Sequence, residues 1–289
     1  MSKAYSSLLS LAINATGGLS RREWKIGSNT GNQLITQHSG WTIDQVNSYV
    51  FNQVIHNWDN QYGVLRGLFS GHDESAVSAE DTFGSSAFQL GSNGLHGCQV
   101  VTVVSKRAVW MAHFWESYTN GKPNRVEISP RSGITAFDER MIYFLTGRSV
   151  DLATADKGKY DQAYPDYAPT KNHPYLTPTG DPLDKTNFNQ PGDETKVFIM
   201  TPLSDTSTLK KPFLKYQRRL ERVEQALISY LGPDITVVFV PYKRIEDLAE
   251  QDTDQRGLAL FQYDPNADGH GLRQWRLFYE NRVVVGNVS

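Results

Sequence analysis

Two apolar segments on either side of a short polar break constrain the fold of this chain more than any other feature. They read CQVVTVVS from residue 98 and VWMAHFWE from residue 109. β-Branched, alternating residues of this kind predict strands, and the intervening Ser105-Lys106-Arg107-Ala108 predicts a tight turn. Because both faces of the resulting hairpin are largely apolar, we expect it in the middle of a sheet that is covered on both sides.

Cys98 is the single cysteine of the chain, and His113 follows it by fifteen residues, on the second strand of this hairpin. A turn centred between Ser105 and Lys106 places the two residues directly opposite each other, on one face and with Cβ atoms about 4.5–5.5 Å apart. The same register adds four side chains to that face: Val100, Thr102, Val109 and Met111. The sequence therefore predicts that a thiol and an imidazole meet at the open end of the hairpin, where solvent can enter. A slip of one residue would separate them.

A thiol beside an imidazole is the standard activated nucleophile for acyl transfer, because the imidazole accepts the thiol proton and later protonates the leaving group. The preceding segment, LGSNGLHG, is rich in glycine, so its backbone N–H groups can approach a developing oxyanion. The backbone amide of Cys98 is a further candidate donor. Ser92 lies six residues before Cys98. The chain that leads into the strand can bring it close to His113, where its hydroxyl would orient the imidazole.

A second interpretation of the same residues is purely structural. A free cysteine is among the most buried residue types and often behaves as a small apolar side chain. A histidine in an apolar strand is commonly a core residue with its hydrogen bonds satisfied. On this interpretation the chain is a non-catalytic binding protein with a buried thiol.

Helices and strands alternate irregularly along the rest of the chain. Apolar periodicity predicts helices over residues 41–58, capped by Thr42, over 137–147, ending at Gly147, and over 212–232, with Phe213 and Leu214 in its core-facing stripe. Strands are expected over residues 195–202, 234–242, 256–264 and 272–280. This grouping predicts an α+β fold with a mixed or antiparallel sheet. A polar stretch with Gly and Ser begins at Ser70.

We expect residues 1–289 to form one domain, with a long irregular insertion at about 150–194 that is rich in Pro, Asp, Asn and Tyr. Such a segment is typical of a lid or a docking surface for a macromolecule. The chain gives no indication of its oligomeric state.

The charge balance argues against two classes of partner. The net charge is -2 and the isoelectric point about 6.4, which gives no electrostatic reason to bind nucleic acid or an anionic membrane surface.

No apolar run approaches the roughly 18 residues that span a bilayer. The first residues form a poor secretory signal, so a cytoplasmic protein or a delivered effector is favoured over classical secretion.

One further motif resembles part of a metal-binding loop. The segment DPNADGHG has Asp264, Asn266, Asp268 and Gly269 at the spacing that opens a calcium-binding loop. The twelfth position, however, is Trp275, where such a loop needs a bidentate glutamate. A plain turn between two strands is therefore expected, and no metal site is predicted.

The string Gly94-x-x-Gly97-Cys98, followed by a β-branched strand, a turn and Met-Ala-His, resembles the active-site region of cysteine-dependent glutamine deamidases. This superfamily includes the bacterial chemoreceptor deamidases and the catalytic domains of the cytotoxic necrotizing factor toxins. The resemblance covers residues 94–116. It implies a β-sandwich with flanking helices, in which Cys98 is the nucleophile, His113 the base and Ser92 the residue that orients the base.

The resemblance also implies a reaction. The Cys98 thiolate would attack the side-chain amide of a glutamine in a protein substrate, His113 would protonate the departing ammonia, and water would hydrolyse the thioester. No cofactor or metal is required, and with an amine in place of water the same site would perform transglutamination. A Cys/His peptidase or a transglutaminase-type enzyme stays open as an alternative, as does the non-catalytic protein.

Overall fold

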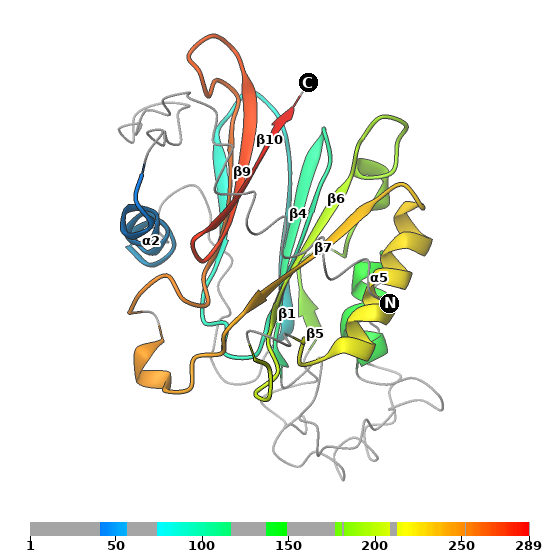
Figure 1. Cartoon of the computed structure of the whole chain (residues 1–289). Coiled ribbons are helices and arrows are strands. Elements are labelled where there is room, and N and C mark those ends of the chain that lie inside the picture. The colour runs from blue at the N-terminus through cyan, green and yellow to red at the C-terminus, as the bar shows by residue number, and fades with distance from the viewer. Residues whose placement is uncertain are drawn as a thin grey trace, which may run out of the picture.

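The computed structural model describes residues 41–56, 74–116, 137–148, 177–180, 182–208, 213–251 and 253–288. These residues form an α+β fold built on two β-sheets, which lie between helix α2 (Ile43–Phe51) and helix α5 (Gln217–Leu231), as Figure 1 shows. The expectation of an α+β fold with mixed or antiparallel sheets is confirmed. In the described part of the chain, no helix is long and apolar enough to cross a membrane.

The larger sheet has six strands in the order β5-β1-β4-β3-β6-β7. Their bounds are β1 Glu74–Thr82, β3 Gln99–Val104, β4 Ala108–Phe114, β5 Thr177–Thr179, β6 Lys196–Pro202 and β7 Thr236–Tyr242. The sheet is mixed, because β5 pairs with β1 and β7 with β6 in parallel, while the other neighbours are antiparallel. The β3–β4 hairpin lies in its middle, as its apolar faces predict.

The smaller sheet has four antiparallel strands in the order β10-β9-β8-β2. Their bounds are β2 Phe88–Ser92, β8 Ala259–Asp264, β9 Arg273–Tyr279 and β10 Arg282–Val288. Strand β2 comes from the first half of the chain and pairs with β8 from the last. The sheet therefore forms by long-range contacts.

Three layers of apolar side chains hold the architecture together. The first lies between the two sheets and joins residues such as Val100 and Met111 of the hairpin to Phe261 and Leu277 of the smaller sheet. The second packs α5 and the short helix α3 (Tyr143–Leu145) against the outer face of the larger sheet, and the third packs α2 against the smaller sheet. Each fully buried side chain of this kind contributes about 1.5–3 kcal/mol to folding.

A local signal explains where α2 begins. Thr42 caps α2 through a capping box with Gln45: the Thr42 hydroxyl accepts from the Gln45 amide and the Gln45 side chain from the Thr42 amide. The described part of the chain also contains four short helical segments: Asn52–His56, Asp138–Ile142, Lys185–Asn187 and Leu248–Glu250. Gly147 follows the Asp138–Leu145 helical run with φ of 72°, in the left-handed conformation that suits glycine at a helix end.

The polar stretch from Ser70, for which no element was predicted, contains β1. Two expectations about secondary structure were wrong or incomplete. The helix expected from residue 212 begins at Gln217, so Phe213 lies outside it and is 39% exposed. Within the segment expected to be irregular, Thr177–Thr179 forms strand β5. Residues 150–176 of that segment lie outside the described residues.

Candidate functional site

The turn of the hairpin sets the register between Cys98 and His113. The Ser105 amide donates to the Ala108 carbonyl at 3.0 Å, so the turn is centred between Lys106 and Arg107. In this register His113 lies opposite Val100, two residues from the expected position opposite Cys98. The predicted direct pairing of Cys98 with His113 is therefore wrong.

The Ser105 side chain explains the difference in register. Its hydroxyl oxygen accepts from the amides of Arg107, at 2.9 Å, and Ala108, at 3.1 Å. Serine favours the first position of a turn because its hydroxyl can bond to backbone N–H groups two and three residues later. The turn therefore starts at Ser105 rather than having Ser105 as a central residue.

The predicted division of side chains between the two faces of the hairpin is correct. A shift of two residues in the pairing register leaves every side chain on the same side of the sheet. Cys98, which directly precedes β3, packs in the layer between the sheets with Val100 and Met111. Trp110 and Phe114 pack on the outer face, as expected. Cys98 and His113 become diagonal neighbours, a relationship that separates positions by roughly 7–8 Å and that long side chains can bridge.

Ser92 and His113 are in direct contact. The Ser92 hydroxyl and the His113 Nδ1 are 2.6 Å apart, a short hydrogen bond. Ser92 is the last residue of β2 and His113 lies in β4, so this bond joins the two sheets. Both side chains are fully buried, with exposures of 0% and 1%. The sequence-based expectation that Ser92 approaches His113 is met in the geometry.

The remaining surroundings of His113 leave its second ring nitrogen free. The ring stacks on Trp115 with centroids 4.5 Å apart, and Nε2 is buried without a hydrogen-bond partner in the part of the chain that the structure describes. Burial lowers the pKa of His113 to about 3, so the imidazole is neutral at physiological pH. When Nδ1 carries the ring proton and donates it to the Ser92 hydroxyl oxygen, Nε2 is unprotonated and can serve as the proton acceptor.

The Cys98 thiol is likewise neutral at rest. Burial raises its pKa to about 11, and the Glu116 carboxylate adds to the rise. The backbone amides of Glu116 and His96 hydrogen-bond to the sulfur and act in the opposite direction. These two amides are therefore the groups placed to stabilise negative charge on the sulfur.

Gly97 occupies a position that a larger residue could not take without strain. Its φ is 120°, and a Cβ there would lie 2.2 Å from Oε2 of Glu116. The glycine-rich segment before Cys98 thus allows a close approach of backbone to a carboxylate. The Gly97–Cys98 segment is also held from β7, because Tyr242 hydrogen-bonds to both residues.

A charged cluster that the sequence did not reveal lies against this segment. The Glu116 carboxylate is 2.9 Å from Nζ of Lys215 and 3.6 Å from Arg244, and it accepts a short hydrogen bond from the hydroxyl of Tyr216. Burial, followed by the positive charge of Arg244, lowers the pKa of His96. Glu116 ends the hairpin, but its partners are about a hundred residues away, and no local pattern connects them.

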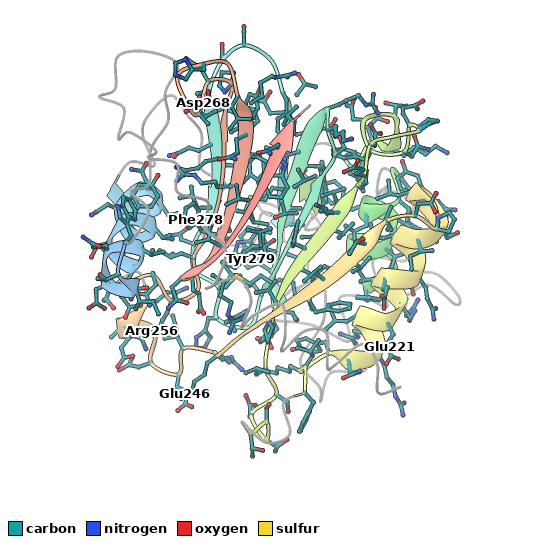
Figure 2. The ribbon with its side chains drawn as sticks, turned by 45° about the horizontal axis from the view of Figure 1, so that its top comes forward. Glu221, Glu246, Arg256, Asp268, Phe278 and Tyr279 are labelled. Atoms are coloured by element: carbon teal, nitrogen blue, oxygen red, sulfur yellow. The ribbon has the colours of Figure 1, made fainter. Side chains whose placement is uncertain are left out.

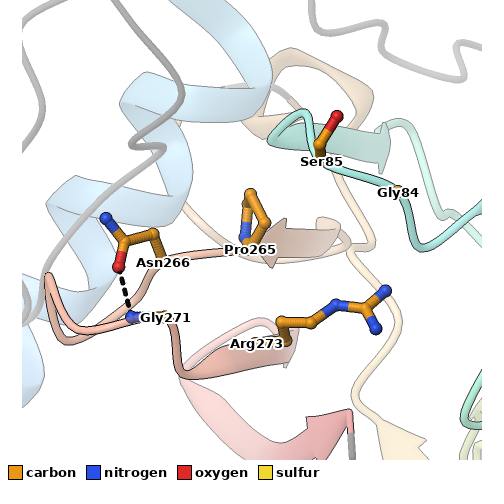
Figure 3. Close-up of a pocket in the computed structure, with 6 residues that line it drawn as sticks. All are labelled: Gly84, Ser85, Pro265, Asn266, Gly271 and Arg273. Atoms are coloured by element: carbon orange, nitrogen blue, oxygen red, sulfur yellow. Dashed lines mark hydrogen bonds between the residues drawn. The ribbon is translucent and has the colours of Figure 1, made fainter.

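In the turn between β8 and β9, the side chains at the calcium-loop positions bond to the backbone of the turn. Asp264, Asn266 and Asp268 each direct a side-chain oxygen to backbone amides of the turn, as Figure 3 shows for Asn266 and Gly271, 2.7 Å apart. Those oxygens stabilise the turn itself. Among the residues that the structure describes, no three His, Cys, Asp or Glu side chains are grouped for a metal ion.

Beside this turn lies a surface hollow of about 460 Å³. It is lined by Gly84, Ser85, Pro265, Asn266, Gly271 and Arg273 (Figure 3). The Arg273 guanidinium is engaged by the Tyr263 hydroxyl and the Phe83 carbonyl. Because Ser85 precedes β2 and Ser92 ends it, the hollow lies at the opposite end of the smaller sheet from His113.

Comparison with models of known protein families and with curated protein sequences gives no match. The candidate site therefore rests on the geometry around Cys98 and His113 and on the resemblance of residues 94–116.

Proposed function

We propose that this protein is a cysteine hydrolase that deamidates glutamine side chains in a protein substrate. Cys98 is the nucleophile, His113 the general base and acid, and Ser92 the residue that orients the imidazole. One observation carries the proposal: Nδ1 of His113 and the Ser92 hydroxyl are hydrogen-bonded at 2.6 Å, and with Nδ1–H as the donor Nε2 is an unprotonated acceptor without a described partner, on the sheet face that also holds Cys98.

The reaction proceeds in two halves. In the first, His113 Nε2 accepts the thiol proton as the sulfur of Cys98 bonds to the glutamine amide carbon. The tetrahedral intermediate then collapses, its C–N bond breaks, and the imidazolium returns the proton to the leaving nitrogen, which departs as ammonia. In the second half, His113 takes a proton from water as the hydroxide attacks the thioester. The C–S bond then breaks, the imidazolium returns its proton to the sulfur of Cys98, and the glutamate product is released.

Both groups start neutral, so the chemistry resembles that of a serine–histidine pair more than that of a preformed thiolate–imidazolium pair. The pKa of about 11 for Cys98 and about 3 for His113 keep this state across the physiological range. Proton transfer must therefore accompany nucleophilic attack. The amides of His96 and Glu116 favour the reaction because they hydrogen-bond to the sulfur as its charge develops.

A second candidate, a non-catalytic protein with Cys98 as a core residue, is favoured by the burial of the thiol, which is 7% exposed. The two candidates differ in what a mutation of Cys98 does. A core residue affects stability alone, whereas a nucleophile is indispensable for turnover.

The test is ammonia release from a pool of folded glutamine-containing proteins, with each product mapped by peptide mass spectrometry for conversion of glutamine to glutamate. Wild-type protein is compared with Cys98→Ala and His113→Asn, after each variant is shown to melt cooperatively. Conversion that both substitutions abolish supports deamidation. Backbone cleavage instead indicates a peptidase, amine incorporation indicates a transglutaminase, and equal behaviour of all three proteins contradicts catalysis.

A further inference from the structure

The backbone ladder that supports Cys98 is interrupted at one residue. Ser105 and Ala108 form a hydrogen-bonded pair across the hairpin. Going back along the chain from Ser105, every second residue therefore directs its backbone N–H and C=O groups toward β4. The residues between them, the last of which is Cys98, direct these groups toward β6. Val100 pairs with Met200 of β6, so the residue facing Cys98 in the continued register is Pro202.

Pro202 cannot complete this ladder. Proline has no N–H group, so it offers no donor to the Cys98 carbonyl. Its own carbonyl accepts from the Lys215 amide at 3.0 Å, outside the sheet. The main chain beside the candidate nucleophile therefore needs a donor from elsewhere.

Tyr242 supplies that donor. It is the last residue of β7, pairs with Pro202 across the parallel β6–β7 ladder, and is 1% exposed. Its hydroxyl donates to the Cys98 carbonyl at 2.9 Å and accepts from the Gly97 amide at 2.8 Å. One side chain thus bonds to both ends of the Gly97–Cys98 dipeptide.

We infer that Tyr242 is a positioning residue for the nucleophile. Its hydroxyl supplies the hydrogen-bond donor that Pro202 lacks, and it fixes the backbone to which the Cys98 thiol is attached. The bond to the Gly97 amide also restrains a residue that has more backbone freedom than any other type and that lies here at a φ of 120°. The inference rests on the proposed function for its kinetic consequence, but its effect on the thiol is independent of any substrate.

The test compares Tyr242→Phe with Tyr279→Phe. Tyr279 lies on β9 near the middle of the molecule (Figure 2) and is equally buried. Its hydroxyl also makes two hydrogen bonds, to Thr102 at 2.7 Å and to the Phe198 carbonyl at 3.1 Å. The two substitutions remove the same group from the same core, and only the first touches the Cys98 segment.

We expect Tyr242→Phe to lower kcat about ten-fold or more while KM changes little, since small displacements of a reacting group cost rate rather than binding. Alkylation of Cys98 by iodoacetamide should become faster in the same variant, because the segment is released. Tyr279→Phe should leave both quantities at the wild-type values, although its melting temperature falls by a similar amount.

Equal kcat and equal alkylation rates in the two variants would overturn the role of Tyr242. If instead wild-type protein has no deamidase activity but Tyr242→Phe alone accelerates alkylation, the positioning role stands and the proposed function fails.

Discussion

Ser92 and His113 belong to different sheets, and the 2.6 Å hydrogen bond between them ties the sheets together at the end where Cys98 lies. The imidazole of His113, in β4, is thereby hydrogen-bonded to a residue of β2, a strand that is not paired with β4 in either sheet. A site built in this way depends on how closely the two sheets are packed, and each of its groups can be tested separately.

Ser92→Ala should reduce turnover more than it reduces stability. Loss of a buried hydrogen bond costs about 1 kcal/mol in the free energy of unfolding, whereas an imidazole without its orienting partner loses a large part of general-base catalysis, about ten-fold or more in kcat. Steady-state kinetics and urea unfolding measure the two effects.

Thr102→Val is the matched control, because it removes a fully buried hydroxyl from the same layer between the sheets. Similar losses of stability and unequal losses of kcat support the orienting role of Ser92. Proportional losses in both variants would show that Ser92 acts through folding alone.

The stability of the protein should depend on pH through His113. Its pKa is about 3 when folded and near 6.5 when unfolded, so between these values the unfolded chain binds more protons. Stability is then complete above about pH 6.5 and falls as the pH drops, by about 1.4 kcal/mol per unit. Urea unfolding at neutral pH and at about pH 5 should differ by about 2 kcal/mol more in wild type than in His113→Asn.

Other histidines contribute equally to both proteins and cancel in that comparison. Identical pH dependence of wild type and His113→Asn would mean that the imidazole titrates normally in the folded protein.

Alkylation of Cys98 should show no activated thiolate in the free protein. Because burial raises the pKa of the thiol to about 11, from 9.0 in the unfolded chain, the rate with iodoacetamide should keep rising with pH until about pH 11. At neutral pH the folded protein should react about 100-fold more slowly than protein unfolded in urea. A rate plateau between about pH 6 and pH 8 would instead reveal a thiolate–imidazolium pair.

Gly97→Ala should be destabilising for two separable reasons. Alanine is strained at a φ of 120°, and its Cβ would contact the Glu116 carboxylate. We expect a loss of about 1–3 kcal/mol in thermal or urea unfolding. Adding Glu116→Ala to the variant should relieve the contact and restore part of the loss.

Gly192→Ala isolates the backbone cost, since Gly192 has a φ of 85° and nothing within 4 Å of the added Cβ. A loss at Gly97 no larger than that at Gly192 would rule out the contact with Glu116 as a source of strain.

The sequence predicted the faces of the hairpin but not its turn. Alternation of apolar residues is a local property, and it placed Cys98 and His113 on one face of a central hairpin. The register instead depends on the Ser105 hydroxyl, which selects where the turn begins by bonding to two amides. Moving the start of the turn within the polar segment 105–108 changes the pairing register by two residues but does not change the pattern of apolar residues.

Long-range partners were beyond the reach of periodicity. Tyr242 ends an apolar strand and has the sequence context of a core residue, and nothing near it indicates that it bonds to Gly97 and Cys98. Strand β1 was missed for another reason: its sequence ESAVSAEDT is polar, and it is recruited to the sheet by its neighbours β4 and β5. Ser92, in contrast, was found because a small hydroxyl residue shortly before the cysteine fits the motif.

The pairing of β2 with β8 has a consequence for synthesis of the protein on the ribosome. In the described part of the chain, Ser92 joins a sheet through Ala259, a residue translated long after Cys98 and His113. A nascent polypeptide would thus carry its thiol and its imidazole, with no hydroxyl held against the ring, until Ala259 has been made. Under the proposed function, competence for chemistry would arrive only after β8 has emerged and docked.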